Sequence, residues 1–227
     1  RIPTLSLRVA RRIADALVFA KIRAAVGGRV RLFASGSAPL DPEIARFFYA
    51  ANMPILEGYG LTETSPVLTV NTPDEMRVGT VGRPVVCTQI RIAEDGEILA
   101  KGPQVMRGYF NRSEETANTI DLEGWLHTGD IGELDADGYL RITDRKKDLI
   151  KTSGGKYVAP QPIENRIKRT VFVDQAIMVG DRRKFVALLV VPDFGVLERW
   201  AREQGLPIAD REALISHPAV QEKMAEE

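Results

Sequence analysis

The sequence predicts an α/β fold in two unequal units, and three changes of pattern along the chain support this prediction. Residues 30–51 have the order strand, small-residue turn and helix, which makes one α/β unit. Residues 79–142 consist of short alternating runs separated by glycines, which is typical of β structure. After Asp144 helical and strand patterns alternate again, which indicates a smaller α+β unit. We expect one large domain over residues 1–145, with an α/β part (1–78) and a β-rich part (79–145). A smaller domain follows over residues 146–227.

The single elements follow from hydrophobic spacing and from residues that start or stop regular structure. Apolar residues three and four apart among Arg and Lys predict a helix over residues 5–26, ended by two glycines. A buried strand at 30–34 and a helix over 39–51 follow. Asp95-Gly96 and Asp137-Gly138 favour hairpin turns. Further strands are expected at 55–58, 89–92, 97–101, 131–134, 139–142, 175–179 and 186–191, and further helices from Gln161 and Gly195.

Composition excludes several classes of function. Lys plus Arg and Asp plus Glu both number 31, so no net positive field attracts nucleic acid. Cys87 is the only cysteine, which excludes an internal disulfide framework and favours a reducing compartment. No apolar stretch approaches the ~20 residues of a membrane span. We therefore expect a cytoplasmic protein.

The first helix leaves two interpretations open. A basic amphipathic helix over residues 5–26 can rest on an anionic membrane surface, and it can equally cover a protein core with its apolar side. Peripheral membrane association thus stays an alternative. The chain begins with Arg1 rather than Met and enters the helical pattern at once, so we expect its numbering to start inside a longer protein.

The loop 57–64, Glu-Gly-Tyr-Gly-Leu-Thr-Glu-Thr, has the chemistry of a nucleotide site. The ring of Tyr59 can stack on a purine, and the hydroxyl of Thr62 can reach a phosphate oxygen beside glycine backbone. The carboxylate of Glu63 offers the oxygen ligands that Mg²⁺ prefers. A loop with a capping threonine and a solvated glutamate explains the same residues without a ligand.

Three stretches together resemble the adenylate-forming superfamily, which contains AMP-forming acyl-CoA synthetases, luciferases and peptide-synthetase adenylation domains. They are the nucleotide motif 59–64, the ribose motif Gly124–Asp130 and the hinge motif Gly138–Lys151, in family order. The resemblance implies a large AMP-binding domain that ends near Arg145, followed by a mobile lid domain that is truncated here.

By that resemblance, the first half of the chain holds the adenine and phosphate contacts. Tyr59 would stack on adenine, Thr62 would contact the α-phosphate, and Glu63 would bind Mg²⁺. Gly60 belongs to the same nucleotide motif. The adenine and acyl pockets would be lined by Gly36, Ser37 and Ala38.

The resemblance also implies roles for residues further along. Asp130 and Arg145 would hydrogen-bond the ribose hydroxyls, which suits a carboxylate acceptor and a guanidinium donor. On their residues alone, Asp130 could form a turn and Arg145 could lie in a solvated charge cluster. Lys147 would be the pivot of the lid domain. Gly154 would line a pantetheine tunnel, although an ordinary turn explains it as well.

The implied reaction uses ATP, Mg²⁺ and CoA to convert a fatty acid to acyl-AMP and then to acyl-CoA. Residues 149–160 most resemble long-chain fatty acid–CoA ligases. The family's phosphate loop and its late lysine are not found in the sequence, so we expect the 227-residue chain alone to be inactive. Two alternatives remain: an acyl–acyl carrier protein ligase, and a non-catalytic adenylate-binding module. The oligomeric state is not predicted.

Overall fold

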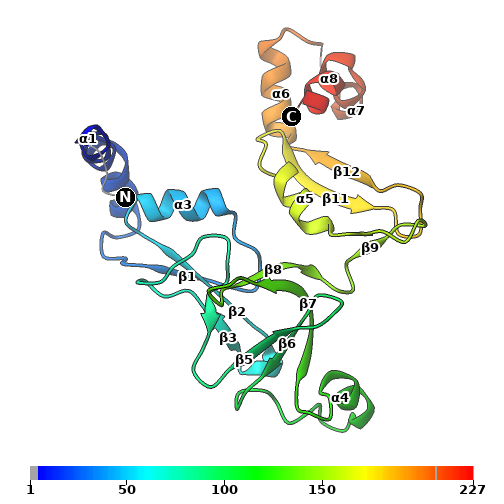
Figure 1. Cartoon of the computed structure of the whole chain (residues 1–227). Helices are drawn as coiled ribbons and strands as arrows, with labels where there is room; N and C mark the ends of the chain where they lie inside the picture. The colour runs from blue at the N-terminus through cyan, green and yellow to red at the C-terminus, as the bar shows by residue number, and fades with distance from the viewer. Residues whose placement is uncertain (1–4, 208, 227) are drawn as a thin grey trace. The chain divides into compact units, whose positions relative to one another are not determined.

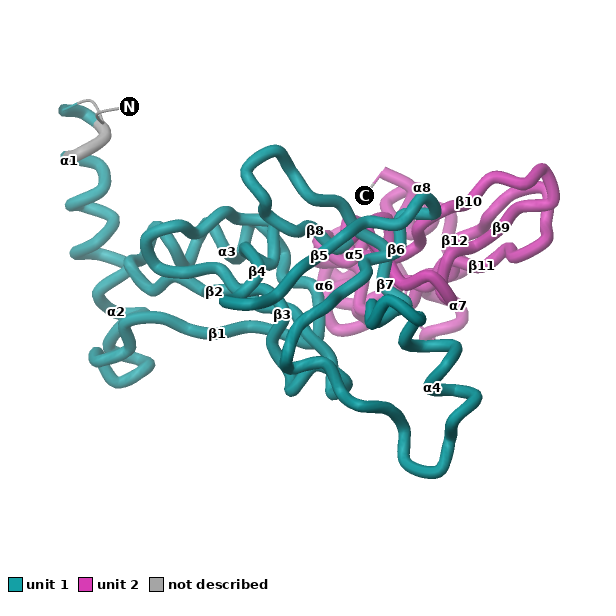
Figure 2. Tube along the Cα trace, turned by 60° about the horizontal axis from the view of Figure 1, so that its bottom comes forward, with its two compact units in different colours: residues 1–142 teal, residues 143–227 magenta. Residues whose placement is uncertain are grey.

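A computed structural model describes residues 5–207 and 209–226 (Figure 1). The chain divides into two compact units, residues 1–142 and 143–227 (Figure 2). This division lies three residues before the predicted boundary, inside a strand that begins in the larger unit. Each unit has its own core and is described by itself.

The larger unit opens with one nearly continuous helix, made of α1 (Leu5–Ala14), a π-helical turn (Asp15–Phe19) and α2 (Ala20–Ala25). Gly27 and Gly28 end it with positive φ angles, as the sequence predicts. Apolar side chains four residues apart on this helix are exposed in the described chain, and core cover and membrane contact both stay open for this face. These side chains are Leu5, Val9, Ile13 and Leu17.

The first sheet has the order β1-β2-β3-β4. β1 and β2 are parallel and are joined by α3, whose first turn is capped by the carboxylate of Asp41 accepting the Glu43 N–H. β1 begins at Phe33 rather than at residue 30, because its pairing with β2 begins there. The bounds are β1 Phe33–Ser35, α3 Pro42–Ala50, β2 Ile55–Gly60, β3 Val67–Val70 and β4 Arg83–Pro84.

The second sheet has the order β5-β6-β7-β8, with each strand beside its neighbour in sequence. Both predicted Asp-Gly turns are confirmed: Gly96 and Gly138 have φ angles of +86° and +81° between paired strands. The bounds are β5 Gln89–Ile92, β6 Glu97–Lys101, α4 Ser113–Thr119, β7 Leu126–Leu134 and β8 Leu140–Arg145.

One hydrophobic core joins the two sheets of the larger unit. Its buried members come from β2, β3, β6 and β8, and they are Tyr59, Leu68, Ile98, Ala100 and Leu140. Burial of these side chains stabilises both sheets together, because apolar surface removed from water contributes about 25 cal/mol per Å². The aromatic residue of the nucleotide motif is therefore also part of the core.

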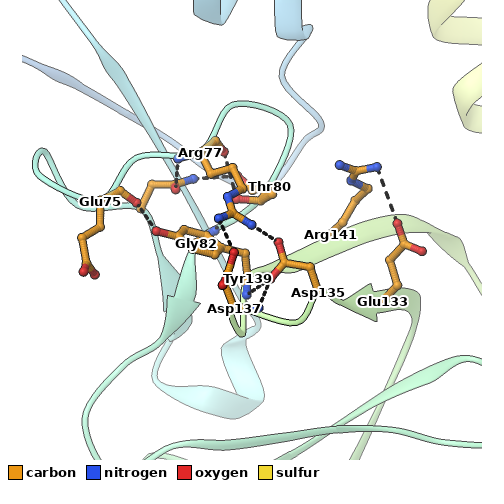
Figure 3. A network of polar contacts seen from close by, with 10 residues as sticks. Glu75, Arg77, Thr80, Gly82, Glu133, Asp135, Asp137, Tyr139 and Arg141 are labelled. Atoms are coloured by element: carbon orange, nitrogen blue, oxygen red, sulfur yellow. Dashed lines mark hydrogen bonds and ion pairs between the residues drawn. The ribbon is translucent and has the colours of Figure 1, made fainter. Parts of the chain in front are cut away.

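A polar cluster attaches the β7–β8 hairpin to the loop before β4 (Figure 3). Two guanidinium groups lie over the Tyr139 ring: that of Arg77 is 4.1 Å and that of Arg83 is 4.5 Å from the ring centroid. Its hydroxyl donates to the Glu75 carbonyl at 2.9 Å. Arg77 also pairs with Asp135 and Asp137 in the hairpin turn. The hairpin is thus held by cation–π contacts and by paired charges.

The residues of the smaller unit that the structure describes, 143–207 and 209–226, form two β hairpins and four helices. The strand and helix predictions from residue 160 onward hold to within a few residues. Its core consists of Phe172, Leu197, Ala201, Leu214 and Val220. The bounds are β9 Ile150–Lys151, β10 Tyr157–Val158, α5 Pro160–Ile167, β11 Val173–Val179, β12 Ala187–Pro192, α6 Phe194–Glu203, α7 Arg211–Ser216 and α8 Pro218–Glu226. None of the helices in the described part of the chain has the length and apolar character that crossing a membrane requires.

Candidate functional site

The loop after β2 is locked by two residues that the sequence analysis did not treat as structural. A side chain on Gly60 would place a carbon 1.6 Å from the Pro66 carbonyl oxygen, so only glycine fits. The fully buried Thr64 hydroxyl accepts the Leu61 N–H at 2.9 Å and lies 2.6 Å from the Pro66 oxygen. The short helical turn Thr62–Thr64 is thereby fixed, and Thr62 is left exposed.

Glu63 in this turn is oriented by a residue that the sequence analysis missed. The Tyr109 hydroxyl donates to Glu63 Oε1 at 2.9 Å, and the Met106 N–H donates to the Glu63 carbonyl at 2.7 Å. The hydrogen bond to the carboxylate raises the pKa of Tyr109, because the carboxylate favours the protonated phenol. No sequence pattern near Tyr109 indicates this contact across 46 residues.

The structure brings together two predicted site residues that lie 71 positions apart. The Tyr59 hydroxyl donates to Asp130 Oδ2 at 2.6 Å. Both are nearly buried, with 9% and 6% of their surface exposed. A hydrogen bond to an ionised acceptor in a partly dry site is among the stronger kinds. The adenine-stacking residue and the ribose carboxylate of the sequence prediction are therefore direct neighbours, whereas stacking itself stays a prediction.

A buried carboxylate that the sequence analysis missed lies next to this pair. Residues 128–130 bulge from β7 opposite the single residue Ile98 of β6. Glu97, which is 5% exposed, accepts the Gly129 N–H at 2.9 Å on Oε1. Its Oε2 lies 3.1 Å from His127 Nδ1. Glu97 is therefore hydrogen-bonded to the backbone of Gly129, the residue directly before Asp130.

The loop Gly36–Ala38 leaves β1 at the edge where β2 also ends. These two strands are parallel, and ligands in open α/β sheets bind at that edge. An added side-chain carbon on Gly36 would lie in van der Waals contact with the Gly58 carbonyl oxygen, at 3.4 Å, and Ser37 has a left-handed φ angle of +67°. Nearby, burial raises the pKa of the Glu57 carboxyl, against hydrogen bonds from the Leu40 and Gly79 backbone.

The remaining predicted residues belong to the smaller unit. Arg145 ends β8, Lys147 lies in the exposed turn that follows, and Gly154 lies in the turn of the β9–β10 hairpin. Asp144, also missed by the sequence analysis, is 1% exposed and accepts the Arg145 N–H at 2.7 Å and the Gln161 N–H at 3.4 Å. Burial raises the pKa of Asp144. This carboxylate connects the turn to the start of α5.

Two family profiles match this chain. The profile described as AMP-binding enzyme matches residues 3–110, and the one described as AMP-binding enzyme C-terminal domain matches residues 147–221. The chain belongs to the AMP-binding enzyme family. The Thr62–Thr64 turn lies in the first matched region and Gly154 in the second, whereas Asp130 lies between them.

Curated proteins similar to this chain include proteins named fatty acid–CoA ligases. The long-chain-fatty-acid–CoA ligase FadD15 of Mycobacterium bovis is 42% identical over 198 residues, which is 87% of this chain and 33% of that protein. Long-chain-fatty-acid–CoA ligase 6 of Mus musculus is 41% identical over 205 residues, 85% of this chain and 29% of its own length. The chain spans about a third of the length of these relatives. The predicted resemblance to acyl-CoA synthetases of the long-chain group is confirmed.

Solved structures confirm the predicted α/β class. The structure of O-succinylbenzoate coenzyme A synthetase of Bacillus subtilis, in complex with AMP, matches with a TM-score of 0.67 and 28% sequence identity. The match covers 83% of this chain and 43% of the synthetase chain. ATP-bound MatB of Rhodopseudomonas palustris has a TM-score of 0.64 and 35% identity over 73% of this chain and 36% of its own.

The carboxylate of Glu63 fits the divalent cation expected in an AMP-binding enzyme. Its Oε1 accepts from Tyr109, and a carboxylate has further lone pairs on both oxygens. Within residues 5–207 and 209–226 no three His, Cys, Asp or Glu side chains gather into a metal cage. Proteins commonly hold Mg²⁺ with one or two carboxylates together with nucleotide phosphates.

Proposed function

We propose that these residues are part of an AMP-forming long-chain fatty acid–CoA ligase. The observation that carries the proposal is the hydrogen bond between Tyr59 and Asp130, which brings the nucleotide motif and the ribose motif to one place. The ligase names of relatives at 41–42% identity support the fatty acid substrate class. Because the chain spans a third of those relatives, the activity is proposed for the protein that contains these residues.

The proposed reaction has two displacements. A carboxylate oxygen of the fatty acid attacks the α-phosphorus of ATP, and the bond to pyrophosphate breaks to leave acyl-AMP. The sulfur of CoA then attacks the acyl carbon, the mixed-anhydride bond from that carbon to the phosphate oxygen breaks, AMP leaves with its electron pair, and the thiol proton passes to solvent or to the phosphate. None of the predicted site residues forms a covalent bond, so the protein acts by positioning and electrostatics.

In this proposal the larger unit binds the nucleotide. Asp130 accepts hydrogen bonds from the ribose hydroxyls, and its Oδ2 also accepts one from the Tyr59 hydroxyl. The exposed hydroxyl of Thr62 reaches the α-phosphate from a turn that Gly60 and Thr64 keep rigid. Mg²⁺ held at Glu63 would neutralise phosphate charge when bound. Gly36, Ser37 and Ala38 line the adenine and acyl side of the same sheet edge.

The smaller unit is proposed to serve both half-reactions. Arg145 donates to the ribose, Lys147 is the point about which the unit turns, and Gly154 leaves room for the pantetheine thiol. An added carbon on Gly154 would meet only the Thr152 hydroxyl, at 4.0 Å, so the backbone there is open. A cytoplasmic location with peripheral membrane contact belongs to the proposal as well, since the substrate is a lipid.

Pyrophosphate release from ATP tests this function. The full-length protein is incubated with palmitate, CoA and Mg²⁺, beside the 227-residue chain alone. We expect release and acyl-CoA formation by the full-length protein and none by the isolated chain. Acyl transfer to carrier protein without transfer to free CoA would favour the carrier-protein ligase. A full-length protein that binds AMP and is silent with several acyl lengths would favour a binding module.

A further inference from the structure

The strand that carries Asp130 is irregular just before this residue. Residues 128–130 bulge out of β7 opposite Ile98, and Gly129 has a φ angle of +73°. A β-bulge bends its strand and changes the direction of the side chains in it, and bulges are frequent beside active sites. The bulge also removes backbone groups from the ladder, and buried backbone groups need other partners. The direction of Asp130 therefore depends on what holds the bulge.

The side chains of Glu97 in β6 and Thr128 in β7 accept hydrogen bonds from backbone N–H groups of the bulge. Glu97 Oε1 accepts the Gly129 N–H at 2.9 Å, and Oε2 is 3.1 Å from His127 Nδ1. The Thr128 hydroxyl donates to the Ile98 carbonyl at 2.7 Å and accepts the Asp130 N–H at 3.2 Å. The irregular backbone is thus held on both sides of Gly129.

The burial of Glu97 indicates that this arrangement is more than a surface contact. Glu97 is 5% exposed, and a buried carboxylate is costly unless hydrogen bonds compensate for its lost hydration. Removing its acceptors would leave the Gly129 N–H without its side-chain partner, and the backbone of residues 128–130 would no longer be held in one conformation. A change of that backbone would redirect the Asp130 side chain, whose carboxylate lies 2.6 Å from the Tyr59 hydroxyl.

We propose that Glu97 is a positioning residue for ribose recognition, which holds the 128–130 bulge and thereby aims the Asp130 carboxylate. This inference rests on the proposed function, because it takes Asp130 as the acceptor for the ribose hydroxyls. His127, which lies 3.1 Å from the second oxygen of the Glu97 carboxylate, is closer to solvent: its side chain is 38% exposed, whereas that of Glu97 is 6% exposed. Glu97 does not touch the nucleotide.

The test compares two nucleotides that differ only in the groups that Asp130 would bind. ATP and 2′,3′-dideoxy-ATP are titrated into the full-length protein by calorimetry, without acyl substrate. In Glu97→Ala we expect ATP affinity to fall at least about tenfold, the effect of losing one hydrogen bond to a charged group. The affinity for dideoxy-ATP should change less than about twofold on the same scale. Glu97→Gln keeps an acceptor for Gly129 and should restore most of the preference for ATP.

Three further variants make the test specific. Glu133→Ala removes an exposed carboxylate from β7, the strand that carries the bulge, where it pairs with Arg141; this variant should leave both affinities unchanged. Glu97→Leu fills the buried space without acceptors and replaces the alanine variant if that variant does not unfold cooperatively. In an Asp130→Ala background, Glu97→Ala should have no further effect on the preference.

The outcomes separate the inference from the proposed function. If Glu97→Ala and Glu97→Leu weaken ATP and dideoxy-ATP equally, or leave the preference intact, Glu97 only supports the fold and the inference is wrong. If the unsubstituted protein binds both nucleotides alike and releases no pyrophosphate, the proposed function itself fails.

Discussion

At the scale of single residues, side chains of the candidate site are hydrogen-bonded to other side chains or to the backbone of the site. Tyr59 holds Asp130, Tyr109 holds Glu63, and Asp144 holds the backbone of Arg145. Each contact positions a residue that binds the nucleotide or Mg²⁺ in the proposed function. This matters because a reaction catalysed by positioning is sensitive to displacements of about 1 Å, which can cost on the order of 100-fold in rate.

The first prediction concerns the orientation of Glu63. Tyr109→Phe removes the hydroxyl that donates to Oε1 and leaves the ring in place. We expect the affinity for Mg²⁺ in the ATP complex to fall about tenfold, the lower range for losing a group that orients a metal ligand. Binding of Mn²⁺ to the ATP complex, followed by electron paramagnetic resonance, measures this. Tyr157→Phe, an exposed tyrosine in the smaller unit, is the control. Equal Mn²⁺ affinity in both variants would contradict the role of Tyr109.

The second prediction concerns the charge of Asp144. Burial raises the pKa of this carboxyl above its ordinary value of 3.8, so the folded state favours the protonated form. Its contribution to stability is fully present below pH 3.8 and is lost as pH rises through the raised pKa. Asp144→Asn keeps an acceptor for the Arg145 N–H and carries no charge. We expect the Tm of the variant to exceed that of the unsubstituted protein at pH 7.5, and the difference to vanish near pH 4. A difference independent of pH would refute this account.

At the scale of elements, the sequence predicted the turns whose conformation depends on the residues within them. Asp95-Gly96 and Asp137-Gly138 form their turns because glycine adopts positive φ angles without strain. The Thr62–Thr64 turn lies where the nucleotide motif was expected. Contacts between distant elements were not predictable: Glu97 reaches Gly129 across 32 residues. No spacing rule joins such positions, since the bulge and the sheet register that bring them together exist only after folding.

The same limit explains the first helix. Its spacing predicted an amphipathic helix, and α1 and α2 confirm that pattern. Whether its apolar side is covered depends on tertiary packing rather than on the helix itself. Among the described residues, the ring contact of this helix is made by Phe19, whose ring lies 5.8 Å from that of Phe47.

The third prediction uses the open backbone of the β9–β10 turn. Gly154→Ala adds one methyl where only Thr152 lies within 4.0 Å, so the Tm should be unchanged. If the pantetheine thiol passes this turn, the methyl obstructs it. We expect the thioester step to slow roughly tenfold while adenylation, measured by ATP–pyrophosphate exchange, stays the same. Gly195→Ala, in α6 of the same unit, is a control outside the turn. Equal loss in both half-reactions would argue against a tunnel at Gly154.

At the scale of the whole molecule, the division into two units is the feature that matters for function. Each unit has its own buried cluster, and the chain passes from one to the other at residues 142–143. The predicted nucleotide contacts are divided between them, because Tyr59 and Asp130 belong to the larger unit and Arg145 to the smaller. In the proposed function the smaller unit would turn as a body between the two steps, which would require neither core to unfold.

The fourth prediction tests that turning at Lys147. This residue lies in the exposed turn after β8, where the Asp148 and Leu149 N–H groups bond to the Arg145 carbonyl. Lys147→Pro fixes one backbone angle and restricts Lys146 before it, whereas Lys147→Ala removes the side chain and keeps the backbone free. We expect Lys147→Pro to retain ATP–pyrophosphate exchange and to lose the thioester step by on the order of 100-fold, because the second arrangement of the units becomes inaccessible. Lys147→Ala should instead slow both steps by similar small factors. If proline and alanine affect the two half-reactions alike, the backbone at Lys147 is not the pivot, and the residue acts through its charge.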